Sequence, residues 1–161
     1  MLALAIRPLV LNFQPGTRFN LRRRLQTLQD RFEEDATRFH HSEVLRGLNA
    51  SDVGICDLAD LHRATEREYA LLVRRTEDSE ERVLIRGTVN ETSLPSSFLN
   101  QGFIWYAHSH PNDCTTASGA DRQALQAFAD ATGQQKSVIV TASGSCEAFT
   151  EYQDLSNWTP P

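Results

Sequence analysis

Hydrophobic and polar residues follow a helical period in several parts of the chain. In the segment 21–39 apolar residues recur every three or four positions, which predicts an amphipathic helix of about 20 to 30 residues. A second helical pattern covers residues 118–132 and ends at Gly133, a residue that commonly follows helix ends. Between them, residues 42–66 predict a helical stretch that glycine and polar residues interrupt.

The remaining apolar segments are short and rich in β-branched and aromatic residues, which predicts strands. The first, residues 2–13, contains Pro8 and is typical of an edge strand, because proline cannot donate to a sheet. Five further strands are expected. The first two form a hairpin around a polar turn, and a loop at 90–102 separates the second strand from the third. These five segments are 68–75, 82–89, 103–108, 138–141 and 146–152. Strands mixed with helices in this order indicate an α/β or α+β fold.

The chain has 161 residues, of which 40% are hydrophobic and 23% charged. This length and composition suffice for one domain with one sizeable core. We expect residues 61–161 to form that core. Residues 1–60 are expected to be an N-terminal strand and helical extension packed on it.

Charge and cysteine content exclude several classes of protein. Lys and Arg number 16 against 21 Asp and Glu, a formal net charge of −5, which argues against a nucleic-acid binder or a polybasic membrane-surface protein. No apolar run approaches the roughly 20 residues of a membrane-spanning helix. Cys56, Cys114 and Cys146 form no CxxC pair, which excludes a dense disulfide framework and a cysteine-rich zinc ribbon. We therefore expect a cytoplasmic location, the alternative being a domain of a longer exported protein.

A compact set of polar residues follows the strand expected at 103–108. Side chains alternate across a strand, so His108 and His110 share one face and can converge on one ion. Strict alternation also puts Trp105 on the opposite face, in the core. Ser118 suits a helix N-cap and Asp121 lies in the first turn, which the intervening loop can bring back over the strand end. Two histidines and a carboxylate leave a fourth position for water, the layout of a catalytic zinc site with one ion per chain.

Other interpretations of these residues remain open. The two histidines could be ordinary surface or core residues, and Ser118 with Asp121 could be a capping motif only. Cys114, in the spacer loop, could be the nucleophile of a cysteine hydrolase paired with His108, although this leaves the position of Asp121 unexplained. Cys114 could also pair with Cys146 under oxidation.

The sequence His108-Ser109-His110-Pro111, followed after a spacer by Ser118-Gly119-Ala120-Asp121, resembles the signature of the JAMM (JAB1/MPN+/Mov34) metalloprotease family. The resemblance covers about residues 66–153, and this segment is similar to compact bacterial JAB-like domains. It implies the MPN-like (cytidine-deaminase-like) fold, a curved mixed β-sheet flanked by helices. It also implies zinc-dependent cleavage of isopeptide bonds between ubiquitin-like modifiers and lysines, or of peptide bonds. The partner would then be a protein or peptide substrate, with neither nucleic acid nor membrane involved.

Carried over residue by residue, the resemblance makes His108, His110 and Asp121 the zinc ligands. Ser118 would stabilise the oxyanion or orient the attacking water.

The family also has a glutamate upstream, at the start of the first core strand, that acts as general base. Glu68 fits best, because it opens an apolar strand, although the family's glycine-rich pattern does not follow it. Glu66 lies nearby, and Glu43 begins a segment that resembles part of that pattern, so both remain alternatives.

The same resemblance is compatible with two other functions. The domain could be a non-catalytic MPN scaffold, although such scaffolds usually lack the ligand set present here. It could also be a JAB-like toxin module of a polymorphic secretion system that cuts a different bond with the same zinc.

Overall fold

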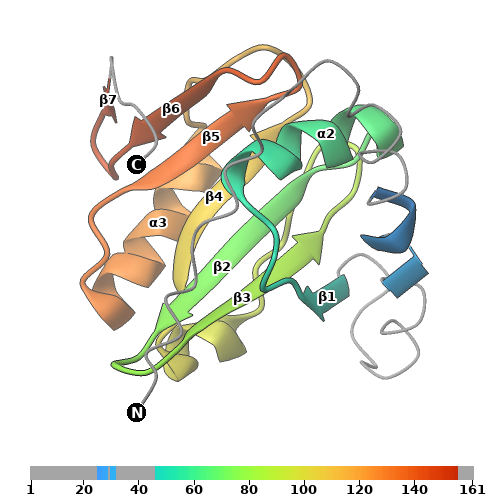
Figure 1. Ribbon diagram of the computed structural model, residues 1–161. Coiled ribbons are helices and arrows are strands. Elements are labelled where there is room, and N and C mark those ends of the chain that lie inside the picture. The colour runs from blue at the N-terminus through green and yellow to red at the C-terminus, as the bar shows by residue number, and fades with distance from the viewer. Residues whose placement is uncertain (1–24, 29, 32–45, 156–161) are drawn as a thin grey trace.

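The computed structural model describes residues 25–28, 30, 31 and 46–155. A mixed sheet of seven strands, in the order β1-β3-β2-β4-β5-β6-β7, forms the centre of this part of the chain (Figure 1). Only β4 and β5 pair in parallel, and the other neighbouring strands pair antiparallel. The strands are β1 (Arg46–Asn49), β2 (Tyr69–Arg75), β3 (Glu80–Arg86), β4 (Ile104–His110), β5 (Ser137–Thr141), β6 (Cys146–Phe149) and β7 (Asp154–Leu155).

Two helices cover opposite faces of the sheet. The helix α2 (Ile55–Thr65) packs its buried Leu58 into a cluster that also holds Leu71 of β2, whereas α3 (Gly119–Thr132) packs Phe128 into a second cluster with Leu72. Leu71 and Leu72 are neighbours on one strand, so their side chains point to opposite faces. The fold is therefore a three-layer arrangement of helix, sheet and helix, with a core on each side.

A β-bulge in β4 decides which side chains reach the α3 face. Opposite β2, Leu71 pairs with Ala107 and Leu72 with Trp105, so Tyr106 is an extra residue on β4. An extra residue shifts the alternation of side chains by one position. Trp105 therefore lies on the same face as His108, and the expectation that strict alternation would put it on the opposite face is wrong.

Most of the expected elements are present in the described part of the chain. The five core strands and the helix from Ser118 to Gly133 are confirmed, with ends shifted by a few residues. The loop at 90–102 contains one short 3-10 helix, η1 (Ser96–Gln101). The broken helix expected at 42–66 is wrong in part, because β1 occupies its beginning and only α2 is helical.

The structure describes only part of the N-terminal segment for which elements are expected. Residues 25–28, 30 and 31 are helical, in agreement with the helix expected at 21–39. The strand expected at 2–13 and the rest of that helix lie outside the described residues. No helix of the described part is long and apolar enough to cross a membrane.

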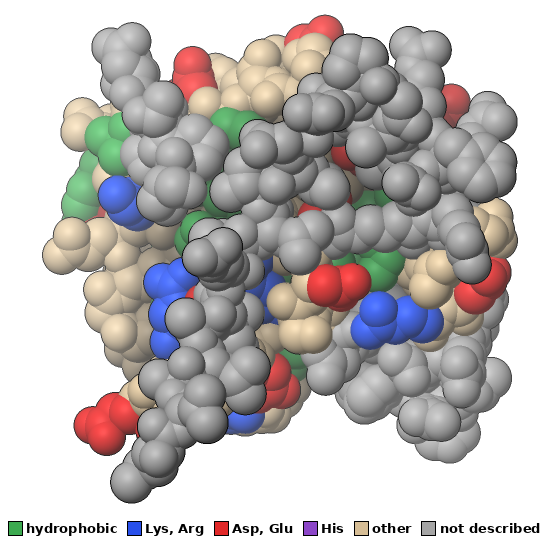
Figure 2. All heavy atoms as spheres, viewed as in Figure 1, with side chains coloured by type: hydrophobic (Ala, Val, Ile, Leu, Met, Phe, Trp, Pro, Cys, Tyr) green, Lys and Arg blue, Asp and Glu red, His purple; other side chains and the backbone are tan. Residues whose placement is uncertain are grey.

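The α2 side of the molecule carries a mixture of charges. Viewed as in Figure 1, the described surface shows basic and acidic side chains interspersed, without an extended basic patch, and no histidine is visible (Figure 2).

Candidate metal and active site

The two histidines come from the central strand β4. His108 pairs with Ala70 on one side and Ile139 on the other, so its imidazole lies deep in the sheet and only 2% of the residue is exposed. His110 ends the strand and is half-buried. The two rings are 4.8 Å apart between centroids, on the face that α3 covers. The period of two seen in the sequence therefore places both imidazoles at one end of the sheet.

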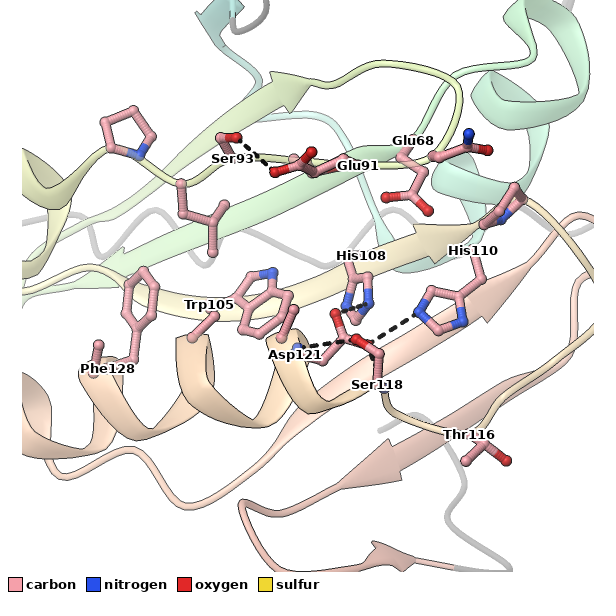
Figure 3. Close-up of a pocket in the computed structure, with 18 of the residues that line it drawn as sticks. Glu68, Glu91, Ser93, Trp105, His108, His110, Thr116, Ser118, Asp121 and Phe128 are labelled. Carbon is pink, nitrogen blue, oxygen red and sulfur yellow. Dashed lines mark hydrogen bonds and ion pairs between the residues drawn. The ribbon is translucent and has the colours of Figure 1, made fainter.

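Asp121 reaches the histidines from the first turn of α3. Ser118 caps this helix: its Oγ accepts a hydrogen bond from the Asp121 N–H at 3.1 Å, and its own N–H donates to Asp121 Oδ2 at 2.7 Å. This capping box fixes the carboxylate in one orientation. Asp121 Oδ1 lies 3.2 Å from His108 Nε2, and Oδ2 lies 3.4 Å from His110 Nε2. Figure 3 shows the three side chains turned toward one another.

This group fits a divalent metal ion. His108, His110 and Asp121 each offer one ligand atom, and these three atoms lie within 4.8 Å of one another. Among the described residues, this is the one group of three or more such side chains that was found. His110 Nδ1 donates to the Cys114 carbonyl at 2.8 Å, which leaves Nε2 for coordination. His108 Nε2 is buried and, although close to Asp121, makes no hydrogen bond. The three residues could thus hold a metal ion.

The electrostatics of the group favour the protonation state of a metal ligand at His108 and Asp121, but not at His110. Burial lowers the pKa of His108, so this imidazole is neutral near pH 7. Burial alone would raise the pKa of Asp121, but the two histidines outweigh it and hold that pKa well below its usual range. Metal ligation needs a carboxylate and neutral imidazoles. For His110, burial is outweighed by Asp121, the Cys114 carbonyl and Glu68, which raise its pKa and make it the ligand from which a metal would displace a proton.

Glu68 lies in the same pocket, opposite the capping turn of α3 (Figure 3). It is buried just before β2, and its backbone is fixed by two hydrogen bonds, from its N–H to the Thr88 carbonyl and from the Gly87 N–H to its own carbonyl, each 2.8 Å. Burial raises the pKa of Glu68 to about 7, with His110 acting to lower it and Asp121 to raise it. A carboxyl with a pKa near neutrality can both accept and return a proton, as a general base must.

The pocket around these residues has a volume of about 570 Å³ and runs between α3 and the loop at 90–96. Its charged lining residues are Glu68, Glu91 and Asp121, and no Lys or Arg of the described chain lines it. The rest of the wall combines polar residues of the loop at 90–96 with apolar side chains, among them Leu94, Trp105 and Phe128. The site is therefore an acidic centre in a pocket of mixed polar and apolar lining.

Of the alternative bases and nucleophile, Glu66 and Cys114 lie in the described part of the chain. Glu66 follows α2 in a left-handed conformation, is exposed and does not line the pocket. Glu43 lies outside the described residues. Cys114 lines the pocket, and its carbonyl accepts from His110. Cys114 and Cys146 are free thiols in the structure.

Trp105 and Glu91 are among the lining residues that were not predicted from the sequence. Trp105 reaches the pocket only because of the bulge at Tyr106, which no local pattern indicates. Glu91 comes from the loop after β3, whose path is fixed by the Glu91 carbonyl accepting from the Thr88 N–H.

No match to this chain was found among protein-family models, curated proteins or solved structures.

Proposed function

We propose that this protein is a zinc-dependent hydrolase of the JAMM type, with an MPN-like fold, that cleaves isopeptide or peptide bonds. The observation that carries the proposal is the placement of Glu68, a buried carboxyl with a pKa of about 7, in the same pocket as His108, His110 and Asp121. A metal-binding group alone would serve a scaffold equally well. A base with a neutral pKa beside it favours catalysis.

The ligand set supports zinc as the metal. Two imidazoles and one carboxylate are the protein ligands of many catalytic zinc sites, which keep one position open. Zinc held by these residues would supply a Lewis acid that polarises the scissile carbonyl and acidifies water.

Two side chains have roles that their own geometry supports. Glu68 accepts the proton of the attacking water and returns it to the leaving amine, which matches a pKa of about 7. Ser118 Oγ accepts from the Asp121 N–H, so its own proton is free to be donated to the oxyanion that forms on the carbonyl.

The substrate class follows from the resemblance and agrees with the pocket. A groove of about 570 Å³ that continues from the acidic centre can hold an extended segment of a modifier ending at a lysine. We propose a ubiquitin-like conjugate as the substrate.

Glu68→Gln tests the proposal, because the amide keeps the shape of the side chain but cannot act as base. We expect the variant to bind zinc as wild type does and to lose at least about a hundredfold in cleavage of a modifier–lysine isopeptide, within the range of general-base effects. Mass spectrometry measures the zinc content, and steady-state kinetics measure the rate of cleavage.

Glu66→Gln is the matched control, because it removes an exposed carboxylate two residues away and outside the pocket. It should keep wild-type activity. Wild-type activity in the Glu68→Gln variant would contradict the proposed mechanism, and a zinc-loaded wild-type protein without hydrolytic activity would favour the scaffold.

A further inference from the structure

Trp105 has a buried hydrogen-bond donor without a partner at the wall of the active-site pocket. The residue is 3% exposed and lines the pocket, and its Nε1 is out of reach of water and makes no hydrogen bond with the described chain. An indole N–H can only donate. Buried polar groups in folded proteins are nearly always paired, so an unpaired donor beside a catalytic centre calls for an acceptor from outside the chain.

The position of the indole ring is fixed by its surroundings. Its plane lies against His108, with ring centroids 4.6 Å apart and an angle of 31°, and Phe149 contacts it edge-on at 5.8 Å. The backbone is held by Gln134, whose amide accepts from the Trp105 N–H at 2.8 Å and donates to the Trp105 carbonyl at 2.6 Å. The main chain of Trp105 is thus satisfied, and the indole N–H alone is not.

The direction of the donor agrees with a role toward a bound molecule. In Figure 3 the indole nitrogen lies on the edge of the ring turned away from α3, between His108 and Phe128 along β4. The ring packs directly on an expected metal ligand, and a residue of extended peptide spans about 3.5 Å. An acceptor on Trp105 would therefore belong to a peptide unit one or two residues from the scissile bond.

We propose that the Trp105 indole N–H binds a main-chain carbonyl of the substrate next to the bond that is cleaved. This inference rests on the proposed function and makes Trp105 a specificity residue for a peptide backbone. Water does not reach the nitrogen in this structure, so a small movement of the pocket wall has to uncover it before the carbonyl can bind.

A binding experiment tests this without relying on hydrolysis. The probe is acetyl-Gly-Gly joined to the side-chain amine of lysine amide, titrated into zinc-loaded Glu68→Gln protein labelled with ¹⁵N. The chain has two tryptophans, Trp105 and Trp158, and Trp158→Phe leaves a single indole signal. We expect this signal to move downfield and to saturate with the probe. An indole signal that stays in place, or a probe that does not bind, overturns the proposal.

Kinetics provide the second measurement. Trp105→Phe keeps an aromatic ring but loses the donor, and we expect it to raise the KM for the probe roughly five- to tenfold, with a smaller change in kcat and unchanged zinc content. Trp158→Phe, the control, should keep the wild-type KM. If the Trp105→Phe variant is active and has the wild-type KM, the inference is overturned and the proposed function stands. If the indole signal shifts and saturates but the wild-type protein does not hydrolyse the probe, only the proposed function is contradicted.

Discussion

The chemistry of single residues in this site depends on their surroundings. Glu68 and Asp121 are both carboxylic acids in one pocket, yet burial raises the pKa of the first to about 7, while the two histidines hold that of the second far below its usual range. A pair of acids whose environments push their pKa values apart is typical of a site in which one acid moves protons and the other stays charged.

The raised pKa of Glu68 predicts a pH-dependent change in stability. A carboxyl whose folded pKa of about 7 exceeds the ordinary 4.5 contributes stability that is present below pH 4.5 and is lost as pH rises through 7. Gln resembles the protonated form at every pH. In metal-free protein, Glu68→Gln should therefore exceed wild type in free energy of unfolding by about 2–3 kcal/mol at pH 8.

Urea unfolding at pH 5 and pH 8 measures this difference. The gain should be smallest at pH 5, because there the wild-type carboxyl is already protonated in the folded state. Asp121 stays charged at both pH values, because the two histidines hold its pKa well below its usual range, so it does not titrate between them. An equal difference at the two pH values would show that Glu68 is not buried as a near-neutral acid.

At the scale of elements, the loop after β3 supports Glu68 through close backbone packing. Gly87 is buried where this loop folds back, and a Cβ at this position would clash with the Glu91 carbonyl oxygen. The Gly87 N–H also donates a hydrogen bond to the Glu68 carbonyl. A side chain at this position has to displace the loop, because the contact is backbone and cannot rotate away.

Gly87→Ala is therefore expected to destabilise the fold by about 1–3 kcal/mol or more and to lower activity by moving Glu68 and the loop. Zinc binding should persist, because its ligands come from β4 and α3. Chemical unfolding and metal analysis measure the two effects. Gly119→Ala is the control, since a methyl group there would have no other atom within 4 Å, and its stability should stay within about 0.5 kcal/mol of wild type. Two variants of equal stability would contradict the packing argument.

At the scale of the whole molecule, the sequence predicts the parts whose signal is local. The pattern from His108 to Asp121 predicts a strand, a loop and a capped helix, and the structure brings the three expected ligands together. Glu68 is singled out only through the family resemblance, with Glu66 and Glu43 as alternatives. The structure places Glu68 in the same pocket as these ligands.

Features that depend on pairing between distant segments could not be predicted. The bulge at Tyr106 exists only in the register of β4 against β2, and it moves Trp105 to the face that carries the candidate metal site. The strand β1 is four residues long and is defined by its pairing with β3, so a broken helical pattern concealed it.

Removal of the metal tests the whole molecule. The candidate ligands come from two elements, β4 and α3, joined by residues 111–118, so an unfolded chain has no preformed site and a bound metal would stabilise the folded state alone. At a free zinc concentration about 100 times the Kd, this linkage adds about 2.7 kcal/mol. For a chain of this size that corresponds to a rise in Tm of about 5–10 °C.

We therefore expect a chelator to lower the Tm of the protein without unfolding it at room temperature, and added zinc to restore it. The fold should survive because two hydrophobic cores hold the sheet and helices. Differential scanning calorimetry with and without zinc measures the shift. His110→Ala leaves two protein ligands and should show no zinc-dependent shift in Tm. A Tm in the wild-type protein that responds to neither chelator nor zinc would contradict a metal site at His108, His110 and Asp121.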